Sequence, residues 1–190
     1  ENSQGKNSVH LAIWRVCELL THTPTAPKVG HRLEDLKRVF GALADSSDPE
    51  HETGEEQVWS IWCDPVDPDA KSTMRKGIEM LANRKIDSAQ ALYDALTQDY
   101  PNWAEAWNKR ATVQYLRGCD CASVIDIGQT LMLEPRHFGA MGGFAQICIR
   151  HGVLDGAQMG LQQMLLVHPF APGVRESIAS ISNSRPSTFH

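Results

Sequence analysis

Apolar residues recur at intervals of three and four along most of the chain, which is the spacing of amphipathic helices. Three such segments occur early, at residues 9–22, 33–43 and 55–62. The stretches between them, 23–30 and 46–54, are rich in proline and threonine or in acidic residues, and are predicted to be loops. The pattern therefore predicts an all-helical protein.

The part of the chain that follows residue 69 repeats itself every 34 residues. Pro101, Pro135 and Pro169 are spaced by this interval, and so are Gly118 and Gly152. A fixed period of this length is typical of repeat proteins in which each unit is a pair of helices. The spacing predicts three units, at residues 70–103, 104–137 and 138–171.

When the three units are aligned, two columns hold small residues and others hold large apolar residues. The small columns read Gly77, Ala111, Ala145 and Ala89, Ser123, Ala157. The large columns hold Trp107 and Met141, then Tyr93, Ile127 and Leu161, then Leu96 and Met164. Two helices can approach closely at small residues, and large residues can interlock across them.

Each unit is predicted to be a helix, a turn and a second helix. The turns fall at residues 83–85, 117–119 and 151–153, where Gly118 and Gly152 can supply a positive φ after a helix end. The proline near the end of each unit cannot continue a helical hydrogen-bond ladder, so it separates one hairpin from the next.

These residues resemble the tetratricopeptide repeat family. The middle unit matches best, with Trp107, Ala111, Tyr115, Gly118 and Pro135 at the family's characteristic positions. The resemblance implies an all-α, α–α superhelix (a solenoid) of three helical hairpins. Residues 1–69 would extend or cap the solenoid, residues 172–182 would form a C-terminal capping helix, and residues 183–190 would be a flexible tail.

Two details refine this resemblance. Gly142 and Gly143 lie inside the first helix of the third unit, so that helix is expected to be the least stable of the set. Residues 106–111 and 133–140, and the region of residues 61–62, also resemble small repeat proteins of undefined function that are common in alphaproteobacteria. This ancestry makes an organelle of bacterial descent, a chloroplast or mitochondrion, the expected location.

In this family the first helix of each hairpin lines a concave groove that holds a peptide or helical segment of another protein. The resemblance therefore implies ten protein-binding positions: Met74, Ile78 and Leu81; Asn108, Thr112, Tyr115 and Leu116; Gln146, Ile149 and Arg150. The alternative is that the chain's own N-terminal helices fill this groove.

The family's chaperone-binding members grip an acidic C-terminal peptide with a clamp of cationic and amide side chains. Here the first clamp positions are Met74 and Ile78, and the later ones are Gly139 and Gly143. Glycine cannot supply a cation, so binding to the C-terminal peptides of cytosolic chaperones is not expected. An apolar or amphipathic helical segment suits these positions better.

Composition and charge narrow the classes of function. A hydrophobic content of 42% in 190 residues can build a core without disulfides or metals. The net charge of -5 comes from interspersed residues, so no basic stripe predicts nucleic-acid binding, and no apolar run is long enough to insert into a membrane. Because the first residue is Glu1, we expect a processed form from which the targeting segment, if there was one, has been removed.

Candidate chemistry is sparse, and no cofactor is predicted. Cys119 and Cys121 could form a redox pair or half of a metal site, but ordinary turn residues are the favoured interpretation. His137, which falls near a unit boundary, is expected to have a structural role at a helix end. Arg110 occupies a column where the family has leucine; it either pairs with an acid such as Glu79 or Asp126, or packs its stem, and stem packing is favoured.

The sequence thus predicts a non-catalytic protein–protein interaction module, a scaffold or assembly factor that binds a partner segment in its concave groove. A permanent structural subunit of a larger, possibly organellar, complex is the first alternative. A redox or metal-dependent factor that uses Cys119 and Cys121 is the second. The oligomeric state is not predicted.

Overall fold

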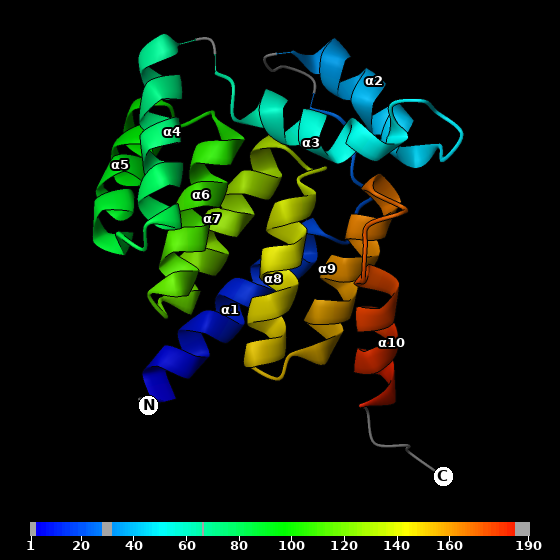
Figure 1. Ribbon diagram of the computed structural model, residues 1–190. Helices are drawn as coiled ribbons and strands as arrows, with labels where there is room; N and C mark the ends of the chain where they lie inside the picture. The colour runs from blue at the N-terminus through cyan, green and yellow to red at the C-terminus, as the bar shows by residue number, and fades with distance from the viewer. Residues whose placement is uncertain (1–2, 28–31, 66, 185–190) are drawn as a thin grey trace.

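The three predicted units fold into three helical hairpins that lie side by side (Figure 1). The computed structural model describes residues 3–27, 32–65 and 67–184, and within them the chain is helical with no strand, as predicted. The hairpins are α4 (Pro68–Ala82) with α5 (Ile86–Asp99), α6 (Ala104–Leu116) with α7 (Asp120–Leu133), and α8 (Phe138–Arg150) with α9 (Leu154–Val167).

The turns inside the hairpins use a left-handed residue, as the glycine pattern predicts. Gly118 has a φ of 74° and Gly152 a φ of 71°. The first unit has no glycine there, and Arg84 adopts a φ of 57° in its place. Asp67 caps the start of the array, because its carboxylate accepts hydrogen bonds from the backbone N–H groups of Asp69 and Ala70.

The small columns mark the closest approach of the two helices in each hairpin. A Cβ atom added to Gly77 would lie 2.6 Å from the Tyr93 ring, so only glycine fits there. Ala111 and Ser123 are both buried, and the Ser123 hydroxyl donates a 2.8 Å hydrogen bond to the Ala111 carbonyl. This bond satisfies the one polar member of the small columns.

Most large residues of the aligned columns are buried between the hairpins, as predicted. Tyr93 and Met141 have no exposed surface. Trp107 differs, because it is only partly buried. Its indole N–H donates to the Pro101 carbonyl over 2.8 Å, and the Arg110 guanidinium lies 4.6 Å from its ring centroid.

Helix α1 (Ser3–Leu19) lies mainly against α7 and α9, the second helices of the middle and last hairpins. Val16 reaches Gly128 of α7, and Cys17 lies close to Gly156 of α9. Residues 1–69 were predicted to extend or cap the solenoid; α1 lies along the second helices of two hairpins, on the side of the array opposite the first helices. Its apolar face fits the shallow surface that small residues leave on α7 and α9.

Helices α2 (Leu33–Ala44) and α3 (His51–Trp62) pack on each other and cross one end of the array (Figure 1). The polar stretch 46–54 was predicted to be a loop, and this holds for residues 46–50 but is wrong for residues 51–54, because α3 begins at His51. Gly54 packs against Leu43, and the His51 ring contacts Phe170. These contacts stabilise a turn of helix that has no apolar periodicity of its own.

Two apolar clusters form the core. The larger one joins the N-terminal helices to α6–α9 and to α10 (Val174–Asn183), through which Val174 and Ile181 close the end of the array. The smaller one fills the first hairpin and its contact with α6. Residues 185–190 of the predicted tail lie outside the described residues. None of the helices in the described part has the length and apolar character needed to cross a membrane.

Candidate functional site

A cavity of about 330 Å³ lies between α6 and α8, with α7 forming part of its wall. This groove is lined by residues from the first helices of the second and third units, as the family resemblance implies. Five of the ten predicted binding residues line it: Asn108, Thr112, Tyr115, Leu116 and Gln146. The other lining residues within the described part of the chain are uncharged as well, so they offer the groove apolar surface and hydrogen-bonding groups.

Arg150 and Ile149 stand beside this groove on the last turn of α8. The Arg150 guanidinium lies 3.9 Å from the centroid of the Tyr115 ring and donates to the Asp120 carboxylate over 2.7 Å. These contacts tie the end of α8 to α6 and α7. Ile149 is exposed, so it adds apolar surface next to the groove.

The three predicted residues of the first unit do not join this groove. Met74 is buried in the core of the first hairpin, and Leu81 packs against the same core. Ile78 is exposed on α4. The structure therefore gathers the second- and third-unit residues in one place and leaves the first-unit residues on or inside a neighbouring hairpin.

The chain's own N-terminal helices do not line the groove in the part of the chain that the structure describes. Helix α1 lies on the other side of α7, and α3 reaches only one end of the groove, where Trp59 packs against Gly139. A Cβ atom on Gly139 would lie 2.4 Å from the Trp59 ring, so this contact requires glycine. The groove remains open between α6 and α8.

A buried polar network lies behind the groove and was not anticipated from the sequence. Glu105 has no exposed surface, and its carboxylate accepts hydrogen bonds from His137 at 2.8 Å and from Asn108 at 3.1 Å. Lys109 adds an ion pair at 2.9 Å. Asn108 thus links the wall of the groove to a buried carboxylate, because its side chain both lines the cavity and donates to Glu105.

The tautomer of His137 follows from its partners. Its Nδ1 atom accepts a hydrogen bond from the Ala140 backbone N–H, which caps the start of α8. The proton therefore lies on Nε2, which donates to Glu105. The ring also stacks on Trp62 of α3, with centroids 4.0 Å apart and planes 10° apart. The prediction of a structural role at a helix end is confirmed for this residue.

The ionised forms of Glu105 and Lys109 stabilise each other in this network. Burial on its own would raise the pKa of Glu105, but the hydrogen bond from His137 and the charge of Lys109 outweigh it and lower that pKa. Burial likewise opposes the charge of Lys109, yet the Glu105 carboxylate raises the pKa of the amine. Burial raises the pKa of Cys63 to about 12, so this thiol stays protonated and donates to Glu105.

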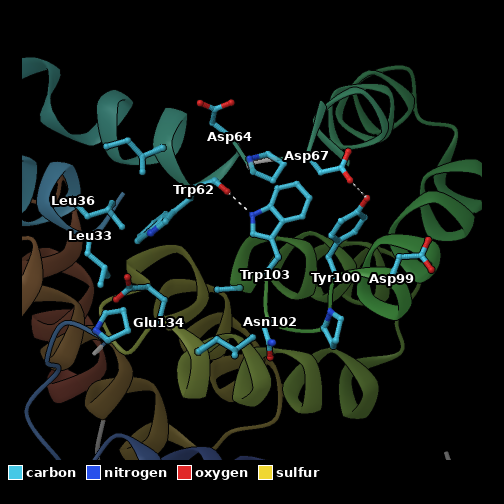
Figure 2. A pocket seen from close by; sticks show the side chains of 16 residues that line it. Leu33, Leu36, Trp62, Asp64, Asp67, Asp99, Tyr100, Asn102, Trp103 and Glu134 are labelled. Atoms are coloured by element: carbon cyan, nitrogen blue, oxygen red, sulfur yellow. Dashed lines mark hydrogen bonds between the residues drawn. The ribbon is translucent and has the colours of Figure 1, made fainter. Parts of the chain in front are cut away.

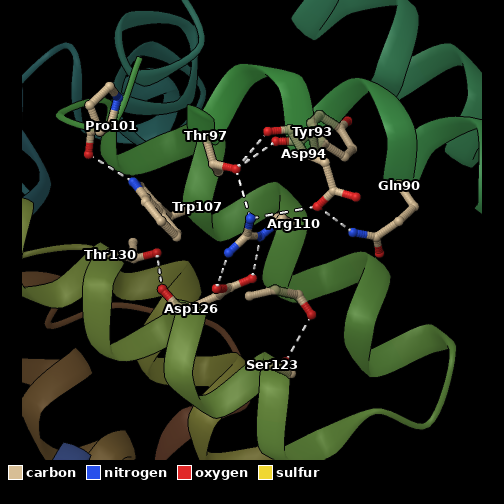
Figure 3. A network of polar contacts seen from close by, with 11 residues as sticks. Gln90, Tyr93, Asp94, Thr97, Pro101, Trp107, Arg110, Ser123, Asp126 and Thr130 are labelled. Atoms are coloured by element: carbon tan, nitrogen blue, oxygen red, sulfur yellow. Dashed lines mark hydrogen bonds and ion pairs between the residues drawn. The ribbon is translucent and has the colours of Figure 1, made fainter. Parts of the chain in front are cut away.

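A second polar network surrounds Arg110 (Figure 3). Its guanidinium donates two hydrogen bonds to Asp126, at 2.7 and 2.8 Å, and one to the Thr97 hydroxyl at 2.8 Å. The sequence analysis favoured simple stem packing, and the structure shows the ion pair with Asp126 instead. The bond to Asp126 raises the pKa of Arg110, while burial raises the pKa of Asp126 despite that bond.

Cys119 and Cys121 are not arranged as a pair. Cys119 is exposed in the turn, whereas Cys121 lies in the first turn of α7 and packs against the core. Residues two apart on a helix do not face each other, which explains the separation. In the described residues no three His, Cys, Asp or Glu side chains converge in a way that could hold a metal ion.

No protein-family model matches the chain. A TPR repeat-containing protein of Rhizobium etli is 29% identical to it over 144 residues, which are 75% of this chain and 71% of the relative. The resemblance to tetratricopeptide repeat proteins is confirmed.

In this array of helical hairpins the sequence pattern predicted the residues of the groove walls but not the polar groups behind them. The repeat period gives the first helix of each unit and hence Thr112, Tyr115 and Gln146. Glu105 lies in the first turn of α6 and His137 precedes α8, so the two residues are 32 positions apart and only the packed structure brings them together. Trp59 and Trp62 come from outside the repeat, where the period carries no information.

Proposed function

We propose that this chain is a non-catalytic protein-interaction module that holds an amphipathic helical segment of a partner protein in the groove between α6 and α8. The observation that carries the proposal is the open cavity between the first helices of two successive units, lined by uncharged residues. Arrays of this repeat type commonly serve as protein-binding scaffolds, and the relative's name gives the same repeat type.

The surroundings of the groove favour apolar anchors over charge pairing. Leu116 lines the groove and is 54% exposed, and Ile149 is exposed beside it. Exposed apolar side chains at the rim of a cavity are typical of sites that receive another protein's anchor residues. A helical segment with apolar residues on one face would cover Leu116 and place a side chain against Gly143 in the cavity.

The test compares two matched lysine substitutions. Leu116→Lys puts a charge in the groove, while Ile125→Lys puts one at an equally exposed position, 58%, on α7 outside the groove. Each variant and the original chain would be used for affinity purification from the native source, followed by mass spectrometry and by a binding measurement with the recovered partner. Leu116→Lys should lose the partner and Ile125→Lys should keep it.

A third variant blocks the cavity without adding charge. A Cβ atom on Gly143 would meet only Ile127, at an ordinary 3.7 Å, so Gly143→Leu should fold and fill the groove. It should weaken partner binding at least as much as Leu116→Lys. If partner binding survives both groove variants but is lost in Ile125→Lys, the proposed groove is wrong and the α7 side is the binding surface.

The alternative of a permanent subunit rests on a separate observation. Leu11 and Trp14 are both exposed on α1 and lie on neighbouring positions of one helix face. A permanent partner would cover such residues. If the isolated chain aggregates and becomes soluble only when it is co-expressed with a partner, this alternative gains; a stable isolated chain favours the transient module.

The redox or metal-dependent alternative has weaker support, because Cys121 packs on the core and Cys119 does not face it. Metal analysis and thiol titration of the purified chain test it, and a bound metal or a Cys119–Cys121 disulfide would favour it. The organellar location stays a prediction, since similarity to a bacterial protein does not place this chain in an organelle. Fractionation of the native cells would test it.

A further inference from the structure

A second cavity, of about 460 Å³, lies at the end of the array and shares no lining residue with the groove (Figure 2). We call it the end pocket. Its walls come from Pro27 and α2, from the end of α3 and the linker that follows it, from the turn between α5 and α6, and from the end of α7. Its size falls within the range of about 300 to 1,000 Å³ that is typical of ligand sites.

Among the residues that the structure describes, the charged side chains that line the end pocket are all acidic. Asp64, Asp67, Asp99 and Glu134 line it, and no lysine, arginine or histidine of the described residues does. Two of these carboxylates form ion pairs with residues outside the pocket. Asp64 pairs with Lys71, and Glu134 pairs with Arg136.

The other two carboxylates leave the pocket with negative charge. Asp67 accepts hydrogen bonds from the Tyr100 hydroxyl and from backbone N–H groups, and these bonds lower its pKa. Asp99 is exposed and has no ion-pair partner within the part of the chain that the structure describes. The pocket therefore attracts a cation.

Aromatic rings occupy the middle of the pocket. Figure 2 shows Trp103 standing between Trp62 and Tyr100. The Trp103 indole N–H donates to the Trp62 carbonyl over 2.7 Å, and its ring meets that of Tyr100 edge to face at 6.4 Å. These contacts fix the ring, so its face offers a preformed surface on which a planar cation can stack.

One polar atom in the pocket wall lacks a partner. The Trp62 side chain is only 6% exposed, and its Nε1 atom has no hydrogen-bond acceptor within the described residues. In Figure 2 this nitrogen faces the end of the pocket near Leu33 and Glu134. A buried N–H without an acceptor is costly, so a ligand that brings a carbonyl oxygen to this point would remove the cost.

We propose that the end pocket binds an arginine side chain of an extended partner segment, with the guanidinium against Trp103 and Tyr100 and near Asp99, and a peptide carbonyl accepting from Trp62. A guanidinium suits the pocket better than an ammonium because it is planar and stacks on aromatic rings. A peptide segment suits it better than free arginine, because the carboxylate of the free amino acid would be repelled by the acidic lining. This site is independent of the groove occupant.

The test uses the full chain labelled with ¹⁵N and follows the indole N–H signals of its five tryptophans. The probe is the blocked tripeptide Gly-Arg-Gly, acetylated and amidated at its ends. Two matched peptides carry citrulline, which has nearly the same shape without the charge, or lysine in place of arginine. Trp62→Phe and Trp103→Phe assign the two pocket signals by the peak that disappears.

The arginine peptide should shift the Trp62 and Trp103 signals saturably, the lysine peptide should bind more weakly, and the citrulline peptide should not shift them. Asp99→Asn should weaken binding about fivefold, the effect of one partly exposed charge pair. Asp87→Asn is the control, because this aspartate is 93% exposed at the start of α5 and does not line the pocket.

Several outcomes would overturn the proposal. Equal shifts with the citrulline peptide would show that binding does not depend on the positive charge. Equal affinity for the lysine peptide would show that the pocket does not prefer a guanidinium. If no saturable shift is seen, the end pocket does not bind arginine. If the Asp99→Asn variant binds like the original chain, the proposed placement of the guanidinium near Asp99 is wrong. Since Leu116→Lys leaves the end pocket unchanged, it should bind the arginine peptide normally, which separates failure of this proposal from failure of the groove.

Discussion

Nε2 of His137 donates a 2.8 Å hydrogen bond to Oε2 of Glu105, and neither side chain is exposed to solvent. Glu105 lies in the first turn of α6 and His137 is the N-cap residue of α8, so the bond fixes the second hairpin against the first helix of the third. A buried carboxylate is tolerated here only because donors surround it. The wall of the groove rests on this contact through Asn108, which donates to the same carboxylate oxygen.

Glu105→Gln should lower the free energy of unfolding by about 3 kcal/mol, because the neutral amide leaves Lys109 without its ion-pair partner in a largely buried position. Urea denaturation measures the change. Glu52→Gln, at an exposed position on α3, is the control and should alter stability by less than about 0.5 kcal/mol. A Glu105→Gln variant as stable as the control would show that the network contributes no net stability.

The stability of the chain should also depend on pH through Glu105. Its folded pKa is lowered, so its contribution is fully present above the ordinary value of 4.5 and is lost as the pH falls below that value. Asp126 acts in the opposite direction, since its pKa is raised by burial. Urea midpoints of the original chain should therefore fall more steeply than those of Glu105→Gln below pH 4.5. Parallel curves would contradict a lowered pKa at Glu105.

Arg110 and Asp126 should be energetically coupled. Arg110→Leu should lower the free energy of unfolding by about 2 to 3 kcal/mol, because it leaves the buried Asp126 carboxylate unpaired. In the Asp126→Asn background the same substitution should cost at least about 1 kcal/mol less. The four urea curves of this double-mutant cycle give the coupling. A coupling near zero would mean that the stem of Arg110 packs and the ion pair contributes nothing.

The fold could be predicted to a large extent, because it repeats. The spacing of Pro101, Pro135 and Pro169 gives the three hairpins, and the small columns give the faces along which their helices meet. The position of α1 could not be predicted in this way, since its apolar face, with Val9, fits any shallow helical surface. Where it docks depends on small residues of α7 and α9 that are distant in sequence.

The residues of the candidate site likewise fall into two groups, those that the repeat predicts and those that it does not. Thr112, Tyr115 and Gln146 follow from the repeat, because the same column of each unit faces the same side of the array. Glu105 and His137 look like ordinary residues at helix starts until packing brings them within 2.8 Å. The end pocket combines α2, the end of α3 and several connecting segments, and no period relates those elements to one another.

Tyr93 and Trp107 should differ in their contribution to stability, although both occupy large apolar columns. Tyr93→Ala should cost about 3 to 5 kcal/mol, because the ring is fully buried against Gly77. Trp107→Ala should cost only about 1 to 2 kcal/mol, since this side chain is half-buried and loses mainly its contact with Arg110. Tyr93→Phe should leave stability unchanged or raise it, because the hydroxyl is buried and no described residue forms a hydrogen bond with it. Urea denaturation of the three variants decides between these expectations: equal losses for the two alanine variants would contradict the burial difference, and a destabilised Tyr93→Phe would show that the hydroxyl has a partner such as a buried water.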